Sequence, residues 1–154
     1  MRDVNCPVSI IIPCLSSIED LKPILFALYQ GDRWPSEILL VDSGNILINN
    51  KESFESLRSK FNINFANLIN TISPYKLLYP GAARNLGCRK ASQDWIAFLD
   101  VNTMPSLDWL SDGYKQIQAN NTKIIFGNTR YIGRTITQRI FIRSTYGERS
   151  VTTV

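Results

Sequence analysis

The stretch Phe98-Leu99-Asp100-Val101-Asn102-Thr103 is an apolar run that ends abruptly in oxygen-bearing side chains. Strand side chains two positions apart point to the same face, so we expect Asp100 and Asn102 to be able to share a single cation. Ile96, Phe98 and Leu99 come before these oxygens and place them at the carboxyl end of a strand. Open α/β sheets bind their ligands at that edge. The stretch therefore predicts an α/β fold with a ligand site beside Asp100.

Other apolar runs along the chain have the same character. Val8–Ile12 is stopped by Pro13, and Glu37–Val41 ends in Asp42-Ser43-Gly44. Short continuous apolar runs are typical of strands covered on both faces. We expect a third strand over residues 94–99 and a fourth over residues 123–126. Asp42 then lies at the carboxyl end of one strand, as Asp100 does at the end of another.

Helical patterns separate these runs. The expected helices cover residues 21–30, with Asp20 as N-cap and Pro23 in the first turn, a segment after Asn50 carrying Phe54, Leu57 and Phe61, a segment after Pro80-Gly81, and one capped by Ser106. The rest of residues 45–79 shows no clear pattern. Strands that alternate with helices predict an α/β class with a mostly parallel, Rossmann-like sheet and helices on both faces.

The helix after Pro80-Gly81 carries small residues four positions apart, Ala83, Gly87 and Ala91. Such a stripe lets a helix backbone pack closely against a sheet, and this structural reading needs no ligand. The same helix places Arg84 in its first turn. A guanidinium at that position adds to the preference of a helix N-terminus for anions.

Length and composition indicate a single globular domain over residues 1–154. The chain is 44% hydrophobic and 19% charged, and no apolar run approaches the roughly 20 residues of a membrane-spanning helix. The first residues contain no secretion signal, and the 3 scattered cysteines fit neither a disulfide framework nor a zinc site. We therefore expect a cytoplasmic protein with reduced thiols.

Histidine is absent, which excludes Ser-His-Asp and Cys-His catalysis and imidazole metal ligands. The net charge of +4 is modest, so we expect small anionic ligands rather than nucleic acid as partners. Five arginines lie between Arg130 and Arg149. A short helix there, with Ile136, Arg139, Ile140 and Arg143, is read either as a solvated face or as a contact with a membrane surface or an anionic acceptor.

Four motifs occur in a familiar order: Val8–Pro13, Glu37–Gly44, Gly81–Gly87 and Trp95–Asp100. Together they give the chain its resemblance to family 2 glycosyltransferases of the GT-A fold, over about Pro7 to Trp109. The resemblance implies an enzyme of polysaccharide biosynthesis that takes a sugar from a nucleotide diphosphate sugar and transfers it, with inversion, to a hydroxyl of a saccharide or lipid-linked acceptor. It also implies that the enzyme acts at the inner face of a membrane.

The resemblance also implies roles for individual residues. Asp42 and Pro13 match the residues around the nucleobase, and Arg84 matches an arginine next to the nucleotide. Asp100 and Asn102 match the DxD element, which holds the ribose and a Mg²⁺ or Mn²⁺ bridging the diphosphate. Asn102 stands where the family usually has aspartate, which lowers the charge offered to a metal. Ser43 likewise replaces a common second acidic residue.

The family's catalytic base lies on a helix beyond the region that this chain matches. We therefore expect the sequence to be a truncated N-terminal part that lacks the acceptor side. Glu148 is the only carboxylate after Asp112, and a surface role fits it better than that of a base. The alternative to an enzyme is a catalytically incomplete nucleotide-binding or interaction module. A dehydrogenase and a P-loop enzyme are excluded by the absence of GxGxxG and GxxxxGK[ST].

Overall fold

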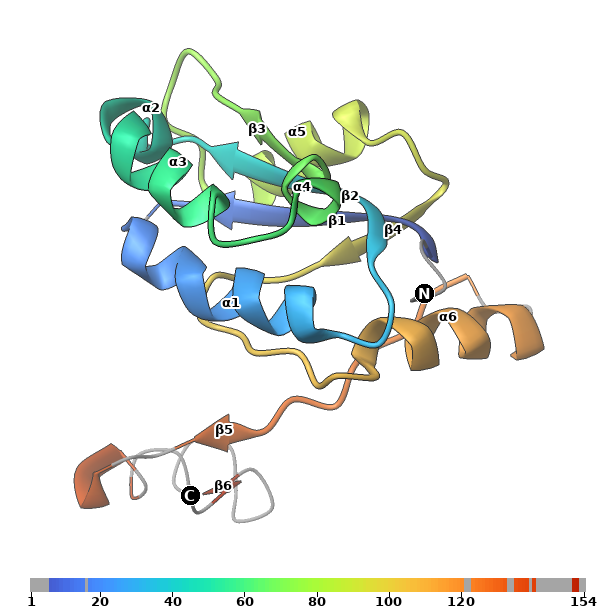
Figure 1. Ribbon diagram of the computed structural model, residues 1–154. Coiled ribbons are helices and arrows are strands. Elements are labelled where there is room, and N and C mark those ends of the chain that lie inside the picture. The colour runs from blue at the N-terminus through green and yellow to red at the C-terminus, as the bar shows by residue number, and fades with distance from the viewer. Residues whose placement is uncertain are drawn as a thin grey trace. The chain divides into compact units, whose positions relative to one another are not determined.

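Four parallel strands form the main sheet: β1 (Cys6–Cys14), β2 (Pro35–Asp42), β3 (Ile69–Ile72) and β4 (Trp95–Phe98). Their order is β3-β2-β1-β4, and in the register Ile11 lies beside Leu39 on one side and Phe98 on the other. The computed structural model describes residues 6–15, 17–120, 123–132, 135–138, 140 and 151–152. Because the strands are parallel, the residues that follow β1, β2 and β4 lie at one edge of the sheet (Figure 1).

We expected Pro13 to stop the first strand, but it lies within β1, opposite Val41. The carbonyl of Ile11 accepts a hydrogen bond from Leu99 at 3.1 Å, so Ile11 faces β4. Pro13 is two residues further on and faces the same way, but β4 has ended at Phe98. In a longer ladder the N–H of residue 13 would donate to the carbonyl of Leu99, so the proline limits the pairing with β4, whereas the pairing with β2 continues through it.

The helices follow the predicted positions, with shifted ends. They are α1 (Ile18–Gln30), α2 (Ile46–Asn49), α3 (Lys51–Arg58), α4 (Ile63–Ala66), α5 (Pro80–Lys90) and α6 (Trp109–Asn120). Helix α1 begins before the predicted residue because Ser17 is its N-cap and Asp20 accepts the backbone N–H of Ser17 at 3.1 Å. Asp20 is thus the third helical residue, and Pro23 lies inside the helix rather than in its first turn.

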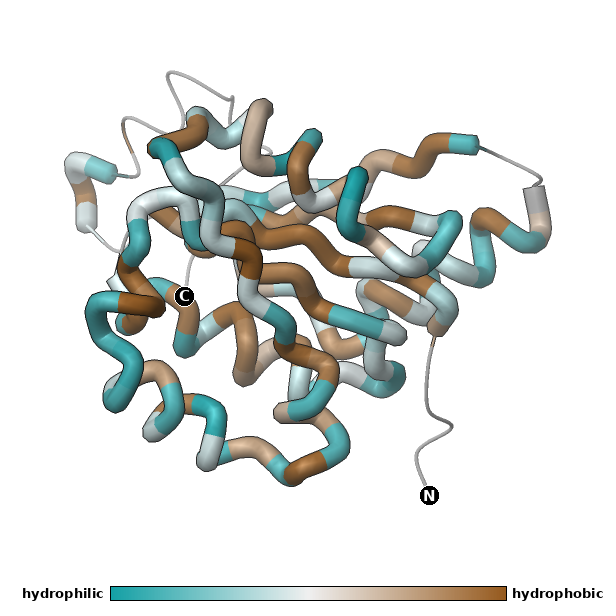
Figure 2. The backbone as a smooth tube through the Cα atoms, turned by 90° about the horizontal axis from the view of Figure 1, so that it is seen from above, coloured by the Kyte–Doolittle hydropathy of each residue, from teal (hydrophilic) through white to brown (hydrophobic). Residues whose placement is uncertain are grey.

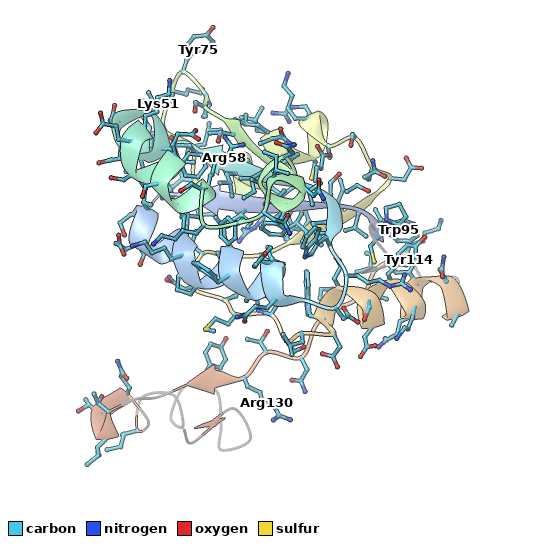
Figure 3. All side chains as sticks on the ribbon, viewed as in Figure 1. Lys51, Arg58, Tyr75, Trp95, Tyr114 and Arg130 are labelled. Carbon is cyan, nitrogen blue, oxygen red and sulfur yellow. The ribbon has the colours of Figure 1, made fainter. Side chains whose placement is uncertain are left out.

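Alternate residues of β1 and β2 face opposite layers of helices. Ile10, Ile12, Ile38 and Leu40 pack with α1, α3 and α4, whereas Ile11, Leu39 and Val41 pack against Ala83 of α5. The predicted arrangement with helices on both faces is therefore confirmed. In Figure 2 the central strands are the most continuous hydrophobic part of the backbone. Near the amino end of β1, Trp95 and Tyr114 (Figure 3) join Cys6, Val8 and Leu110 in a third apolar cluster.

The predicted close approach of α5 to the sheet is also present. Ala83 is fully buried, and a Cβ atom added to Gly87 would lie 2.5 Å from Cγ2 of Ile11. No larger residue than glycine fits this position without movement of the neighbouring side chain. The small-residue stripe therefore has a structural explanation.

The prediction of a strand over residues 123–126 is wrong. Residues 124–130 have no regular secondary structure, and Ile124 and Phe126 are 72% and 90% exposed. Strand β3 was not predicted, and its central residues are exposed although both ends are apolar.

Contacts divide the chain into two units, Met1–Lys115 and Gln116–Val154. The four-stranded sheet belongs to the first unit, and one domain over residues 1–154 stays a prediction. In the second unit β5 (Tyr131–Ile132) pairs in parallel with β6 (Val151–Thr152). Ile136 lies in a helical segment, residues 136–138, and is exposed, whereas Arg139, Arg143 and Glu148 lie outside the described residues. None of the helices that the structure describes is long and apolar enough to cross a membrane.

Candidate functional site

Asp100 begins a tight turn two residues after the end of β4. The carbonyl of Asp100 accepts hydrogen bonds from the backbone N–H of Thr103 at 2.9 Å and from its hydroxyl at 2.6 Å. Asp100 and Asn102 are therefore the first and third residues of a turn, and our argument from strand alternation was wrong because β4 ends at Phe98. The strand itself is less buried than expected, since Phe98 is 47% exposed.

The guanidinium of Arg84 forms an ion pair with this turn. Its Nη2 donates to Oδ1 of Asp100, and the side chains of Arg84 and Asp100 are 32% and 59% exposed. Arg84 is the fifth residue of α5, so it lies in the second helical turn rather than the first. The structure thus joins two of the predicted site residues directly, across the carboxyl edge of the sheet.

Asp42 has the opposite environment, because it is fully buried. Its Oδ1 accepts the backbone N–H of Ile46 at 2.8 Å, and its Oδ2 accepts that of Leu47 at 2.9 Å. These N–H groups belong to the first turn of α2, where backbone N–H groups have no carbonyl of a preceding helical turn to bind. In this structure the carboxylate of Asp42 holds the loop after β2, and its predicted contact with a nucleobase stays a prediction.

The other residues of this edge are also tied to the backbone. Ser43 is buried and donates its hydroxyl to the carbonyl of Leu78 at 3.1 Å, which links the end of β2 to the loop before α5. Cys14 lies opposite Asp42, and burial, together with the charge of Asp42, raises the pKa of its thiol. The Cys14 side chain is therefore a protonated, unreactive thiol at neutral pH.

Asp42 and Pro13 thus lie at neighbouring strand ends, one register position apart, on the same edge as Arg84 and Asp100. Within the described part of the chain no hydrogen bond or ion pair joins Asp42 to Arg84 or Asp100. The edge therefore contains a buried, structural carboxylate and a separate, exposed ion pair.

The residues present fit a divalent cation only in part. Asp100 offers one carboxylate and Asn102 one amide oxygen, and the described residues contain no group of three acidic, cysteine or histidine side chains. Mg²⁺ is commonly held by one or two carboxylates together with substrate phosphates and water. This donor set fits a cation that binds together with a diphosphate, rather than one held by protein groups alone.

A feature that the sequence interpretation missed is the loop of residues 73–79, between β3 and α5. Tyr75, Leu77 and Tyr79 of this loop are exposed, and Tyr75 projects away from the body of the unit (Figure 3). The loop follows the carboxyl end of β3 and precedes the N-terminus of α5, so it borders the same edge as Arg84. Pro74 and Pro80 on either side of these residues were the available signal for a loop.

The parallel sheet, the helices on both faces and the polar carboxyl edge define an α/β domain of the Rossmann-like type. The family model described as glycosyl transferase family 2 matches residues 9–150, so the chain belongs to this family. Structure comparison supports the same fold: the crystal structure of Staphylococcus aureus TarS residues 1–349 with UDP-GlcNAc has a TM-score of 0.64 at 20% identity, over 87% of this chain and 38% of that one. The sheet is thus that of a GT-A fold.

Curated relatives agree. The chain is 28% identical over 127 residues to the glycosyltransferase AglE of Haloferax volcanii, covering 80% of this chain and 40% of the relative. It is 26% identical over 146 residues to the chondroitin synthase of Pasteurella multocida, covering 92% of this chain and 14% of the relative. The chain therefore spans less than half the length of these relatives.

Proposed function

We propose that this chain is the donor-binding part of a glycosyltransferase, which binds a nucleotide diphosphate sugar and passes the sugar to an acceptor hydroxyl with inversion. The observation that carries the proposal is the Arg84–Asp100 pair at the carboxyl edge of the sheet. A guanidinium suits phosphate oxygens, and a carboxylate suits ribose hydroxyls or a hard cation. UDP sugars are the first donors to test, because TarS was crystallised with UDP-GlcNAc and with UDP.

Each predicted site residue then contacts a particular part of the donor. Pro13 and Asp42 border the nucleobase, Arg84 binds the diphosphate, and Asp100 contacts the ribose. Asp100 and Asn102 would hold Mg²⁺ or Mn²⁺. A divalent cation at this position supplies charge neutralisation for the departing nucleoside diphosphate. The acceptor is a saccharide or a lipid-linked sugar, presented at the cytoplasmic face of a membrane.

The proton of the acceptor hydroxyl needs a base as the new bond forms. Asp42 and Asp100 have other tasks, and Glu148 lies outside the described residues. Asn102, which lowers the charge offered to a metal, favours a second candidate, a module that binds the donor without turning it over. Both candidates share the same donor site.

Calorimetry with UDP, GDP and dTDP, each with and without Mn²⁺, tests the donor site. We expect one nucleotide to bind with an affinity that rises with Mn²⁺, and we expect Asp100→Ala to lose most of this Mn²⁺ effect. Asp94→Ala is the matched control, because Asp94 is exposed just before the amino end of β4, whereas Asp100 follows its carboxyl end. Equal binding by Asp100→Ala and the wild type refutes the role of Asp100.

Transfer of labelled sugar by the same preparation separates the two candidates. Transfer to an acceptor, or hydrolysis of the donor, excludes a module that only binds. Donor binding without either reaction supports it.

A further inference from the structure

The ion pair between Arg84 and Asp100 unites two groups that the proposed function assigns to different partners. Arg84 is assigned to the diphosphate and Asp100 to the ribose and a cation, yet in this structure they neutralise each other. Asn102 adds no charge to the turn. While the pair is closed, the carboxylate of Asp100, the one anionic side chain of residues 100–103, is already paired with the guanidinium of Arg84.

This arrangement has an electrostatic consequence. A guanidinium in contact with a carboxylate opposes the approach of a second cation to the same oxygens, and the effect is larger for a divalent ion. A bound diphosphate carries the charge that Arg84 prefers and offers it bidentate oxygens. Arg84 can then leave Asp100, which frees the carboxylate.

We propose, on the basis of the proposed donor site, that Arg84 is a positioning residue that keeps Asp100 from holding a divalent cation until a diphosphate is bound. Cation and nucleotide binding are then coupled through this ion pair, in addition to the direct attraction between the cation and the diphosphate. Coupling of this kind is reciprocal, so the cation tightens nucleotide binding by the same factor as the nucleotide tightens cation binding. Asp100 is exposed and Arg84 is partly exposed, so the pair can open without any change in the core.

Mn²⁺ binding without nucleotide, followed by the electron paramagnetic resonance signal of the free ion, tests the pair directly. We expect Arg84→Gln to bind Mn²⁺ roughly two- to fivefold more tightly than the wild type, since exposed ion pairs are worth modest energies. Arg84→Lys keeps a positive charge and should stay near the wild type. Arg89→Gln is the matched control, because it removes an exposed positive charge from the last turn of the same helix.

The same titration with saturating UDP supplies the second measurement. UDP should tighten Mn²⁺ binding in the wild type, and by a smaller factor in Arg84→Gln, where no ion pair has to be opened. Thermal unfolding of each variant confirms that it is folded.

The outcomes distinguish the two proposals. The role of Arg84 is overturned if, in the absence of nucleotide, Arg84→Gln binds Mn²⁺ no more tightly than the wild type and the Arg89→Gln control do. It is also overturned if none of the three proteins binds Mn²⁺. The donor site itself still stands in that case, provided that the wild type binds UDP. Failure of the wild type to bind any nucleoside diphosphate, with or without Mn²⁺, overturns both.

Discussion

At the scale of single residues, Asp42 and Asp100 show how one sequence context leads to two environments. Both aspartates follow apolar strand residues, but Asp42 is buried and accepts two backbone N–H groups, whereas Asp100 is exposed and paired with Arg84. The difference comes from the next residues of the chain. A helix starts four residues after Asp42 and supplies donors, whereas Asp100 is followed by a turn.

Gly87 allows a stability prediction at this scale. Gly87→Ala places a methyl group 2.5 Å from Cγ2 of Ile11, so we expect a loss of about 1–3 kcal/mol in the free energy of unfolding. Urea denaturation measures it. Gly113→Ala in α6 is the matched control, because nothing lies within 4 Å of its added Cβ atom. Helix propensity predicts that this control gains up to about 1 kcal/mol. Two variants of equal stability would contradict the packing of α5 against β1.

At the scale of elements, a polar network ties β1, β2 and the residues before β4 together. Oε1 of Glu37 accepts the hydroxyl of Ser9 and the backbone N–H of Ser92, both at 2.6 Å, and the Ser9 hydroxyl accepts the N–H of Gln93 at 3.2 Å. Burial raises the pKa of Glu37, but the hydrogen bonds from Ser9 and Ser92 outweigh it, and the net pKa is lowered.

Acid should weaken this network. Because the pKa of Glu37 is lower in the folded chain than in the unfolded one, its contribution is complete above the ordinary glutamate pKa and is lost as the pH falls through the folded-state value. Glu37→Gln should therefore destabilise the protein by about 1–2 kcal/mol at pH 7 and by progressively less as the pH falls below the ordinary glutamate pKa and through the lower folded-state pKa. Urea denaturation at several pH values measures the difference.

The control for this experiment is Glu52→Gln, since Glu52 is an exposed glutamate of α3. Its effect should be small and should vary little across the same pH range. A difference between Glu37→Gln and the wild type that stays constant from pH 7 to pH 3 would contradict the role of the charged carboxylate.

The elements that could be predicted from sequence are those with strong apolar patterns. Strands β1, β2 and β4 and helices α1 and α5 are of this kind. Strand β3 could not be predicted, because its two middle residues are exposed and only β2 gives it a partner. The strand predicted over residues 123–126 is the opposite case: most of its residues are apolar, but an apolar composition alone does not supply the neighbouring strand to which its backbone would have to bind.

The candidate site was predictable in its location but not in its internal contacts. The positions of Asp42 and Asp100 at the ends of apolar strands marked them as site residues, and the position of Arg84 near the start of the helix after Pro80 marked it as a third. The pairing of Arg84 with Asp100 depends on how α5 lies over β1 and β2, which no local pattern encodes. The bond from Ser43 to Leu78 joins positions 35 residues apart and was equally out of reach.

At the scale of the whole molecule, ligand binding and stability are linked. A ligand that binds only the folded chain stabilises it, by about 2.7 kcal/mol at a concentration of 100 times its dissociation constant. The proposed donor site draws on the strands and on α5 together. Nucleotide binding should therefore raise the temperature of the transition that unfolds the sheet.

We expect UDP with Mn²⁺, at 100 times the dissociation constant, to raise the melting temperature by roughly 5–10 °C, as measured by scanning calorimetry. Uridine at the same concentration is the matched ligand control, because it has the base and the ribose but no diphosphate for Arg84. Its shift should be small. Equal shifts with uridine and UDP would place the binding energy in the base and ribose contacts alone, and would remove the guanidinium of Arg84 from the donor site.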